Sequence, residues 1–225
     1  MPVRAKSAPR PGTRGEPEKS RAAILKAALH EFASETVAGA RTDEIARQAG
    51  VNKALLYYYF QDKESLYGAV LDDVFQNMRE RLLAVLNSEL SPRQKILDFA
   101  AAHFDSIAAD PEYPRLVQQE TMRAGRQKSP HLRRLAQNYF QPIYARLLEV
   151  IEEGISAGEF RAVDPRRFAM AMGNVVAHYF NSLPIAQLLG NTDPLSPENL
   201  AAQRAAVLDF ISHALFREPL KATEA

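Results

Sequence analysis

The stretch "RTDEIARQAGVNKALLYYYFQDKESLY", residues 41–67, decides the fold of this chain because it holds two short helical patterns separated by a glycine. Thr42 is expected to cap the first helix, since acidic residues follow it in the first turn, where the helix dipole favours anions. Gly50 supplies the left-handed residue that ends this helix, and Asn52 is a natural N-cap for a second helix through Tyr59. Two short helices joined by such a turn form a helix-turn-helix.

Three successive tyrosines in the second helix cannot all face one core, because successive helical residues point about 100° apart. Leu56 and Phe60 are four residues apart and define the buried stripe. The opposite face then holds Lys53, Ala54, Tyr57 and Tyr58. Half-buried packing is one explanation for the tyrosines. The other is contact with DNA, because the second helix of a helix-turn-helix lies in the major groove, where hydroxyls bond phosphates and rings meet thymine methyls.

Outside this stretch, the helical period dominates and predicts an all-α chain of about nine helices. A first helix is expected over about residues 19–34 and a long fourth helix over about 63–88, capped by Asp62. Five more helices are expected to begin near Pro92, Pro111, Pro130, Pro165 and Pro197. Pro142 falls inside a helical pattern and predicts a kink.

Composition bounds the class of protein. The chain has 225 residues, 46% hydrophobic and 24% charged, with a net charge of +1. No stretch approaches the roughly eighteen apolar residues of a membrane span, so we expect a soluble, cytoplasmic protein without a membrane partner. Residues 1–15 carry four basic residues and no acid, which predicts a disordered basic tail. Because Lys and Arg balance Asp and Glu over residues 16–63, charge is weak evidence for DNA binding.

The sequence also lacks the residue patterns of common reactive sites. Cysteine is absent, and the five histidines lack the paired spacing of a zinc site. No Gly-x-Ser-x-Gly motif occurs. We therefore expect no catalytic residue, no metal and no cofactor.

Residues 41–67 resemble the DNA-binding signature of the TetR family of bacterial transcriptional regulators. The family pattern is a Thr-capped helix, Ala-Gly-Val, a small or polar cap, Leu-Tyr, two residues, Phe and Lys-Glu-x-Leu. The matching residues are Thr42, Ile45, Ala46, Ala49, Gly50, Val51, Leu56, Tyr57, Phe60, Lys63, Glu64 and Leu66. Asn52 replaces the usual serine and Tyr59 a frequent histidine, while Leu55 replaces an often hydroxylated residue, which leaves the operator sequence open.

The resemblance implies a helix-turn-helix domain over residues 16–62, an effector-binding and dimerisation domain over 63–216 and a flexible tail over 217–225. It implies phosphate contacts from Thr42, Tyr57, Tyr59 and Lys63, and base contacts from Lys53, Ala54 and Leu55, with Tyr58 on the same DNA-binding face. Lys53 would reach guanine O6 and N7. The expected partners are double-stranded operator DNA, a small-molecule effector and a second copy of the chain.

For the effector cavity we predict a lining of aromatic, sulfur-containing and polar residues from the central helices, although core packing explains any single aromatic or Met residue more simply, and a histidine in a helix interface is the more common outcome for His178. The predicted residues are Phe104, Tyr113, Met122, Arg123, Tyr139, Tyr144, Asn174 and His178. Arg123 belongs to an acid-free basic run over residues 121–148, which would favour an anionic effector, balance the acidic stretch that follows, or form a solvated face.

For dimerisation, the resemblance implies pairing of the last two long helices, about 164–183 and 196–216. The predicted interface residues are Phe168, Met172, Val176, Val207, Leu208, Ile211 and Leu215; their alternative role is to close the core of a single chain. The whole pattern favours a dimeric, ligand-responsive regulator, most consistent with a repressor. Two alternatives stay open: a regulator that binds no effector, and a helical small-molecule-binding or catalytic protein that has lost DNA binding.

Overall fold

The structure, a computed structural model, describes residues 17–110, 112–125, 129–190 and 193–218. The predicted basic tail and Pro111 lie outside these ranges. The described residues form helices and no strand, apart from one isolated bridge between Phe160 and Phe216, which confirms the all-α prediction. The chain divides into two compact units, one up to Val70 and the other from Leu71. The division therefore falls within the fourth helix, later than the expected boundary at residue 62.

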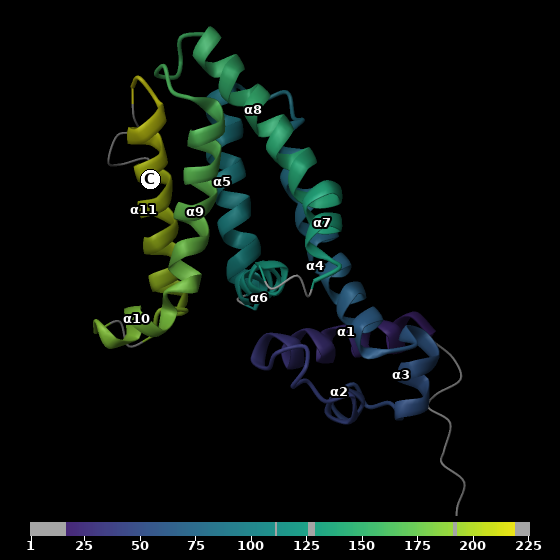
Figure 1. Cartoon of the computed structure of the whole chain (residues 1–225). Coiled ribbons are helices and arrows are strands. Elements are labelled where there is room, and N and C mark those ends of the chain that lie inside the picture. Colours follow the sequence, from purple (N-terminus) through teal and green to yellow (C-terminus); the bar gives the residue numbers. More distant parts are fainter. Residues whose placement is uncertain (1–16, 111, 126–128, 191–192, 219–225) are drawn as a thin grey trace, which may run out of the picture. The chain divides into compact units, whose positions relative to one another are not determined.

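The N-terminal unit contains α1 (Pro17–Ser34), α2 (Thr42–Gln48), α3 (Lys53–Phe60) and the first turns of α4 (Lys63–Leu86) (Figure 1). Its core is formed by one apolar stripe from each helix: Ile24, Leu25, Phe32, Ile45, Leu56, Phe60, Leu66 and Tyr67. The rings of Phe32 and Tyr67 meet edge to face with centroids 4.9 Å apart, a geometry that stabilises beyond the buried area alone. These contacts tie α1 to the beginning of α4.

Most of the predicted helix ends of this unit are confirmed. Gly50 has a φ of 67°, the Asn52 side chain accepts a 2.8 Å hydrogen bond from the Leu55 N–H, and Asp62 accepts one of 2.7 Å from the Ser65 N–H. The prediction for Thr42 was wrong, because Arg41 occupies the N-cap of α2 without a side-chain cap bond. The Thr42 hydroxyl lies within hydrogen-bond distance of another side chain instead, as described below.

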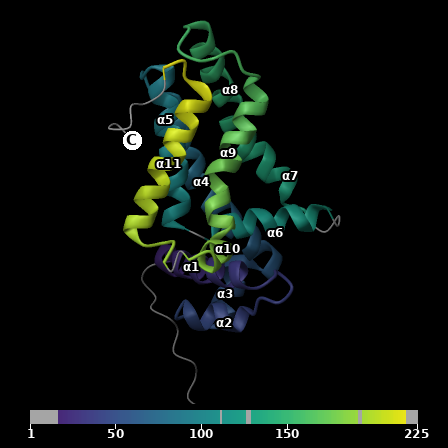
Figure 2. The same ribbon diagram turned by 90° about the vertical axis from the view of Figure 1, so that its left-hand side faces the viewer.

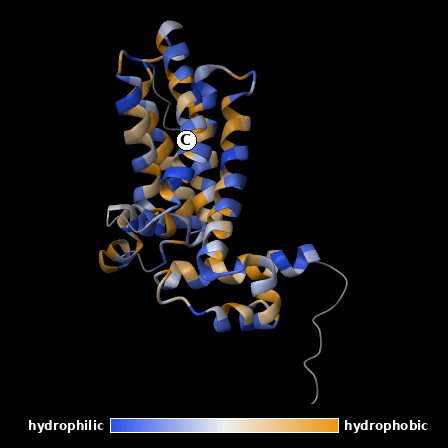
Figure 3. Ribbon diagram, turned by 45° about the vertical axis from the view of Figure 1, so that its right-hand side comes forward, coloured by the Kyte–Doolittle hydropathy of each residue, from blue (hydrophilic) through white to orange (hydrophobic). Residues whose placement is uncertain are grey.

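The C-terminal unit continues α4 and adds α5 (Pro92–Ala109), α6 (Tyr113–Gly125), α7 (Leu132–Leu135), η1 (Ala136–Phe140), α8 (Gln141–Ser156), α9 (Pro165–Asn181), α10 (Leu183–Leu188) and α11 (Pro197–Leu215). Helix α5 is central, since α8, α9 and α11 all pack against it (Figures 1 and 2). Hydrophobic and hydrophilic residues alternate around these helices (Figure 3). Among the described residues, no helix combines the length and apolar composition needed to cross a lipid bilayer.

The prolines position helix starts largely as predicted. Pro92, Pro165 and Pro197 stand in the first turns of α5, α9 and α11, each after a capping residue. The irregularity predicted at Pro142 takes the form of a π-helical segment, η1, directly before α8. Counting α7, η1 and α8 as one helix gives ten helices in the described residues, one more than the expected nine; the short α10 is the addition.

The C-terminal end of this unit is anchored. Buried Phe160 and Phe216 stack with centroids 5.3 Å apart, and the Arg217 N–H donates to the Glu159 carbonyl at 3.1 Å. The Arg93 side chain donates to the Glu218 carbonyl at 2.6 Å. The predicted flexible tail therefore does not include residues 217 and 218, and 219–225 lie outside the described residues.

Candidate functional site

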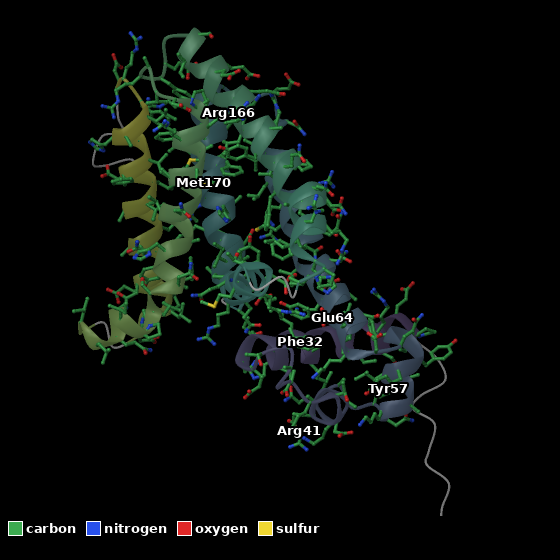
Figure 4. All side chains as sticks on the ribbon, in the orientation of Figure 1. Phe32, Arg41, Tyr57, Glu64, Arg166 and Met170 are labelled. Atoms are coloured by element: carbon green, nitrogen blue, oxygen red, sulfur yellow. The ribbon has the colours of Figure 1, made fainter. Side chains whose placement is uncertain are left out.

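Helix α3 presents one polar, aromatic face to solvent. Leu56 and Phe60 are buried beneath it, whereas Lys53 and Ala54 are exposed, as are Tyr57 at 37% and Tyr58 at 78%. Figure 4 labels Tyr57 on this helix. Leu55 is half-buried at the side of the face. A large aromatic ring as exposed as Tyr58 does not contribute to the core, which favours the binding explanation for at least this tyrosine.

Side chains of α2 and α3 are coupled across this face. The hydroxyls of Thr42 and Tyr57 are 3.1 Å apart, and Lys53 Nζ lies 2.8 Å from Asp43 Oδ1 and 6.0 Å from the centre of the Tyr57 ring. The hydrogen bond with Asp43 raises the pKa of Lys53. Because such an exposed ion pair contributes little stability, Lys53 can exchange Asp43 for a stronger acceptor. Apart from its place in the first turn of α2, nothing in the local sequence indicates that Asp43 belongs to this surface.

Two of the predicted phosphate-binding residues instead make contacts inside the N-terminal unit. Tyr59 is half-buried, and its hydroxyl donates to the Pro17 carbonyl at 3.2 Å. Lys63 Nζ donates to the carbonyls of Ala38 and Ala40 at 2.9 and 3.1 Å. These bonds hold α1 and the loop after it, so both residues have a structural role whether or not they also meet DNA.

The C-terminal unit contains a pocket of about 480 Å³ between α4, α5, α6, η1, α8 and α9. Its lining consists of Met78, Leu82, Phe99, His103, Tyr113, Ala136, Phe140, Gln141, Ile143, Tyr144, Leu147, Ala169, Met170, Gly173 and Asn174. None of these residues carries an ionised side chain at neutral pH, because burial lowers the pKa of the one titratable imidazole among them, that of His103. The apolar wall is buried, while the rim, which includes Gln141, Met170 and Asn174, is exposed. The size and composition are those of a small-molecule site.

Of the eight predicted effector residues, Tyr113, Tyr144 and Asn174 line this pocket. Tyr144 also donates its hydroxyl to the Arg166 carbonyl at 2.6 Å, which fixes its ring between α8 and α9. Burial raises the pKa of Tyr113, so its phenol stays neutral.

The other five predicted residues do not line this pocket. Three of them contact other residues of the protein, and two are exposed on the surface. Phe104 is buried against Phe180, and Tyr139 donates to Asp72 on α4 at 2.8 Å, so both serve contacts between helices. Arg123 pairs with the buried Glu120 at 2.8 Å rather than with a ligand.

Met122 and His178 point away from the pocket. Met122 is 58% exposed on α6, and His178 is exposed and lines a second groove, between α9 and α11, which shares Asn174 with the pocket. Within the basic run over residues 121–148, Arg123, Arg134 and Arg146 each pair with an acidic residue. Arg126 and Lys128 lie outside the described residues, so an anion-binding role of this run stays a prediction.

The predicted dimer residues lie mainly in the core of one chain. Met172, Val176, Val207, Ile211 and Leu215 are each no more than 3% exposed, and Phe168 and Leu208 are half-buried. The apolar stripes of α9 and α11 therefore pack against their own unit, which was the alternative for these residues. The exposed apolar residues of this region are Met170, Ile185, Leu188, Leu189 and Phe210, on α9, at α10 and on α11; Figure 4 labels Met170.

Comparison with known proteins assigns both units. Residues 24–70 match the family model "Bacterial regulatory proteins, tetR family", and residues 92–211 match "Tetracyclin repressor-like, C-terminal domain". The chain is 31% identical to the HTH-type transcriptional repressor SCO4008 of Streptomyces coelicolor over 165 residues, which cover 71% of this chain and 79% of that protein. It is 28% identical to the HTH-type transcriptional repressor NicS of Pseudomonas putida over 167 residues, 73% of this chain and 77% of NicS.

A solved structure shows the same similarity. The transcriptional regulator SCO4942 from Streptomyces coelicolor superposes with a TM-score of 0.67 at 27% identity, covering 88% of this chain and 99% of that one. The matched family models and the named relatives are those of transcriptional regulators, not of enzymes, and the exposed face of α3 agrees with them. The chain belongs to the TetR family of helix-turn-helix transcriptional regulators.

Proposed function

We propose that this protein is a homodimeric repressor that leaves a palindromic operator when a small molecule binds in its C-terminal unit. The observation that carries the proposal is the solvent-exposed face of α3, where Lys53, Tyr57 and Tyr58 stand over a buried stripe. Such a face has no role in the core of the N-terminal unit. A DNA-binding role requires access to the chromosome, so we also propose a cytoplasmic location.

On this proposal, α3 enters the major groove with its N-terminal residues against base edges. Lys53 leaves Asp43 and donates to guanine O6 and N7, while Ala54 and Leu55 contact thymine methyl groups. Thr42 and Tyr57, whose hydroxyls are 3.1 Å apart, both bond backbone phosphates. Tyr58 extends the same face, and Tyr59 and Lys63 contribute mainly by holding the unit together.

The pocket supports regulation by an effector over the alternative of an effector-free regulator. Its wall includes Tyr113 and Phe140, whose rings lie edge to face with Phe75 of α4, both at 5.1 Å between centroids. A ligand that moves these two rings must act on Phe75, and therefore on a helix whose first turns belong to the DNA-binding unit. An effector releases the operator to the extent that it prefers the conformation with lower DNA affinity.

Dimerisation is proposed through the outer faces of α9 to α11. Phe210 of α11 is exposed, and so are Ile185, Leu188 and Leu189 at α10; large apolar side chains that gather in an exposed patch mark interaction sites. Phe210 also lines a groove between α9 and α11, together with His178 and Gln203 among others. Two chains related by a two-fold axis would present two α3 helices to the two half-sites of a palindrome.

A gel-shift experiment with DNA from upstream of the protein's own coding region tests the proposal. The wild-type chain should shift this DNA, and Tyr58→Glu should not, because it places a negative charge on the α3 face. Since Tyr58 is 78% exposed, the variant should keep its fold and melting temperature. Absence of a shift with folded wild-type protein would instead favour the alternative of a helical ligand-binding protein that has lost DNA binding.

A further inference from the structure

His103 of α5 is a polar residue in an otherwise largely apolar wall. It lies one turn after Phe99, with ring centroids 6.2 Å apart, and both residues line the pocket. Its Nδ1 is buried and has no hydrogen-bond partner in the part of the chain that the structure describes. A buried polar atom left unpaired destabilises the folded protein and requires an explanation. Core packing alone does not supply one, because leucine or phenylalanine would fill this position without an unpaired nitrogen.

The protonation state of His103 limits what it can bind. Burial lowers the pKa of His103 to about 4, so the imidazole is neutral at physiological pH. A neutral imidazole has one donor and one acceptor nitrogen, and cannot attract an anion by charge. The χ2 preference of histidine is broad and roughly two-fold, so rotation of the ring can turn a nitrogen toward a group in the pocket.

The other residues of the pocket lining also disfavour a charged ligand, because they too offer no opposite charge. Among the described residues, no Asp, Glu, Lys or Arg lines the pocket, so an ionised group bound there would lose water without gaining a counter-ion. Aromatic faces can attract a quaternary ammonium group, but such a group has no hydrogen to donate to His103. The two side-chain amides of the lining, Gln141 and Asn174, stand at the exposed rim, where water can satisfy their hydrogen-bonding groups.

We propose that the effector is an uncharged, mainly apolar molecule with one hydroxyl or N–H group, and that this group donates a hydrogen bond to the imidazole of His103. His103 is thus the polar anchor that orients the ligand, while Met78, Leu82 and Phe99 cover its apolar body. The inference rests on the proposed effector role of the pocket and adds the chemical class of the ligand.

The test uses matched pairs of small probes and isothermal titration calorimetry at pH 7.5. The pairs are 4-ethyl-, 4-propyl- and 4-butylphenol against the corresponding methyl ethers, with 4-propylbenzoate and choline as charged probes. Each ether keeps the ring and alkyl chain of its phenol, replaces the hydroxyl hydrogen with a methyl group and so loses the donor. For the wild type, at least one phenol should bind about tenfold more tightly than its ether, and neither charged probe should bind as well.

Two variants separate anchoring from packing. His103→Phe keeps an aromatic ring and removes both nitrogens, so the phenol should lose its advantage over the ether while ether binding stays within about threefold of the wild type. Met122→Ala, at an exposed position outside the pocket lining, should keep the phenol preference. Melting temperatures establish that both variants are folded.

The proposal is overturned if no phenol binds the wild type, if phenol and ether bind equally, if His103→Phe retains the preference, or if a charged probe binds best. Operator binding without any probe is measured in parallel for the wild type and His103→Phe. Absence of operator binding by the folded wild type would contradict the proposed function and leave the phenol result to decide the ligand class separately.

Discussion

Lys53 is the residue through which base preference should be visible. Its side chain is exposed, and Nζ lies 2.8 Å from Asp43 Oδ1. In the protein without DNA, the side chain is therefore already positioned on the exposed face of α3. Lys53→Ala should relax the preference at one base pair of each half-site, with a loss of about 1 to 3 kcal/mol for the preferred base. Fluorescence anisotropy with single-base operator variants measures this.

Tyr57→Phe is the matched control for that experiment, because it removes one phosphate-bonding hydroxyl and keeps the ring. It should weaken binding to all operator variants by a similar factor. If Lys53→Ala also weakens every variant equally, then Lys53 contacts only the DNA backbone.

His103 predicts a specific pH dependence of stability. Its pKa is about 4 in the folded chain against an ordinary value of 6.5, so between these values the unfolded state binds more protons. The free energy of unfolding should therefore fall as pH falls from 6.5 toward 4, by about 2 kcal/mol between pH 7.5 and 5.0. Urea unfolding of the wild type and His103→Phe at both pH values isolates this contribution.

His103→Phe should lack that part of the pH dependence, whereas His178→Phe, at an exposed position, should retain it. Identical pH profiles for the wild type and His103→Phe would mean that water reaches the His103 ring in the folded protein. Other groups titrate over the same pH range. The contribution of His103 is therefore the difference between the pH dependence of the wild type and that of His103→Phe.

Residue-level prediction from the sequence succeeded where the cause was local. Gly50, Asn52 and Asp62 act within three or four residues of their own positions, and the structure confirms all three. The Thr42 prediction failed because its hydroxyl meets Tyr57, fifteen residues away on another helix. A cap and a tertiary contact compete for the same hydroxyl, and only the first is visible in the sequence.

Helix α8 packs closely against the ring of Phe160 at Gly154. A Cβ at Gly154 would lie 2.2 Å from the ring of Phe160, which is fully buried. Gly154→Ala should therefore destabilise the protein by about 1 to 3 kcal/mol, even though alanine favours a helix. A Cβ added at Gly173 of α9 would meet no atom within 4 Å, so Gly173→Ala should be neutral or stabilise by up to about 1 kcal/mol. Urea unfolding measures the free energy of unfolding of both variants. Equal changes for Gly154→Ala and Gly173→Ala would contradict the packing described for Phe160.

The helices could be predicted more completely than the surfaces between them. Amphipathic periodicity located the long helices but did not say which helix each apolar stripe would meet. The pocket is formed by residues of six helical segments, so residues such as Met78 and Leu147 carry no local signal of it. For the same reason, the stripes of α9 and α11 were assigned to a partner chain although they pack within their own.

The proposed dimer interface can be tested on α11. Phe210 is 57% exposed, whereas Val207 on the same helix is 3% exposed. Phe210→Glu should give a folded monomer, because a charge at an interface opposes association without disturbing the core. Val207→Glu should lose helical circular dichroism, because it buries a charge within the chain. Sedimentation velocity measures the first effect; a folded Phe210→Glu dimer would exclude this face as the interface.

The whole molecule links two units through one continuous helix, α4, and the account of regulation depends on that link. Tyr139 and Arg134 both contact Asp72 of α4, and Phe75 contacts the pocket rings Tyr113 and Phe140. On the proposed function, ligand and operator therefore act on the same helix. By thermodynamic linkage, the factor by which an effector weakens operator binding must equal the factor by which operator weakens effector binding.

The central claim is that this chain recognises a specific DNA sequence. The most direct measurement is the affinity of the wild-type protein for DNA from upstream of its own coding region, compared with scrambled DNA of equal length at the same near-physiological salt concentration. The account predicts a preference of at least about 10³, with two chains bound per operator. Equal affinity for the two DNAs, or no binding to either by the folded protein, would contradict it.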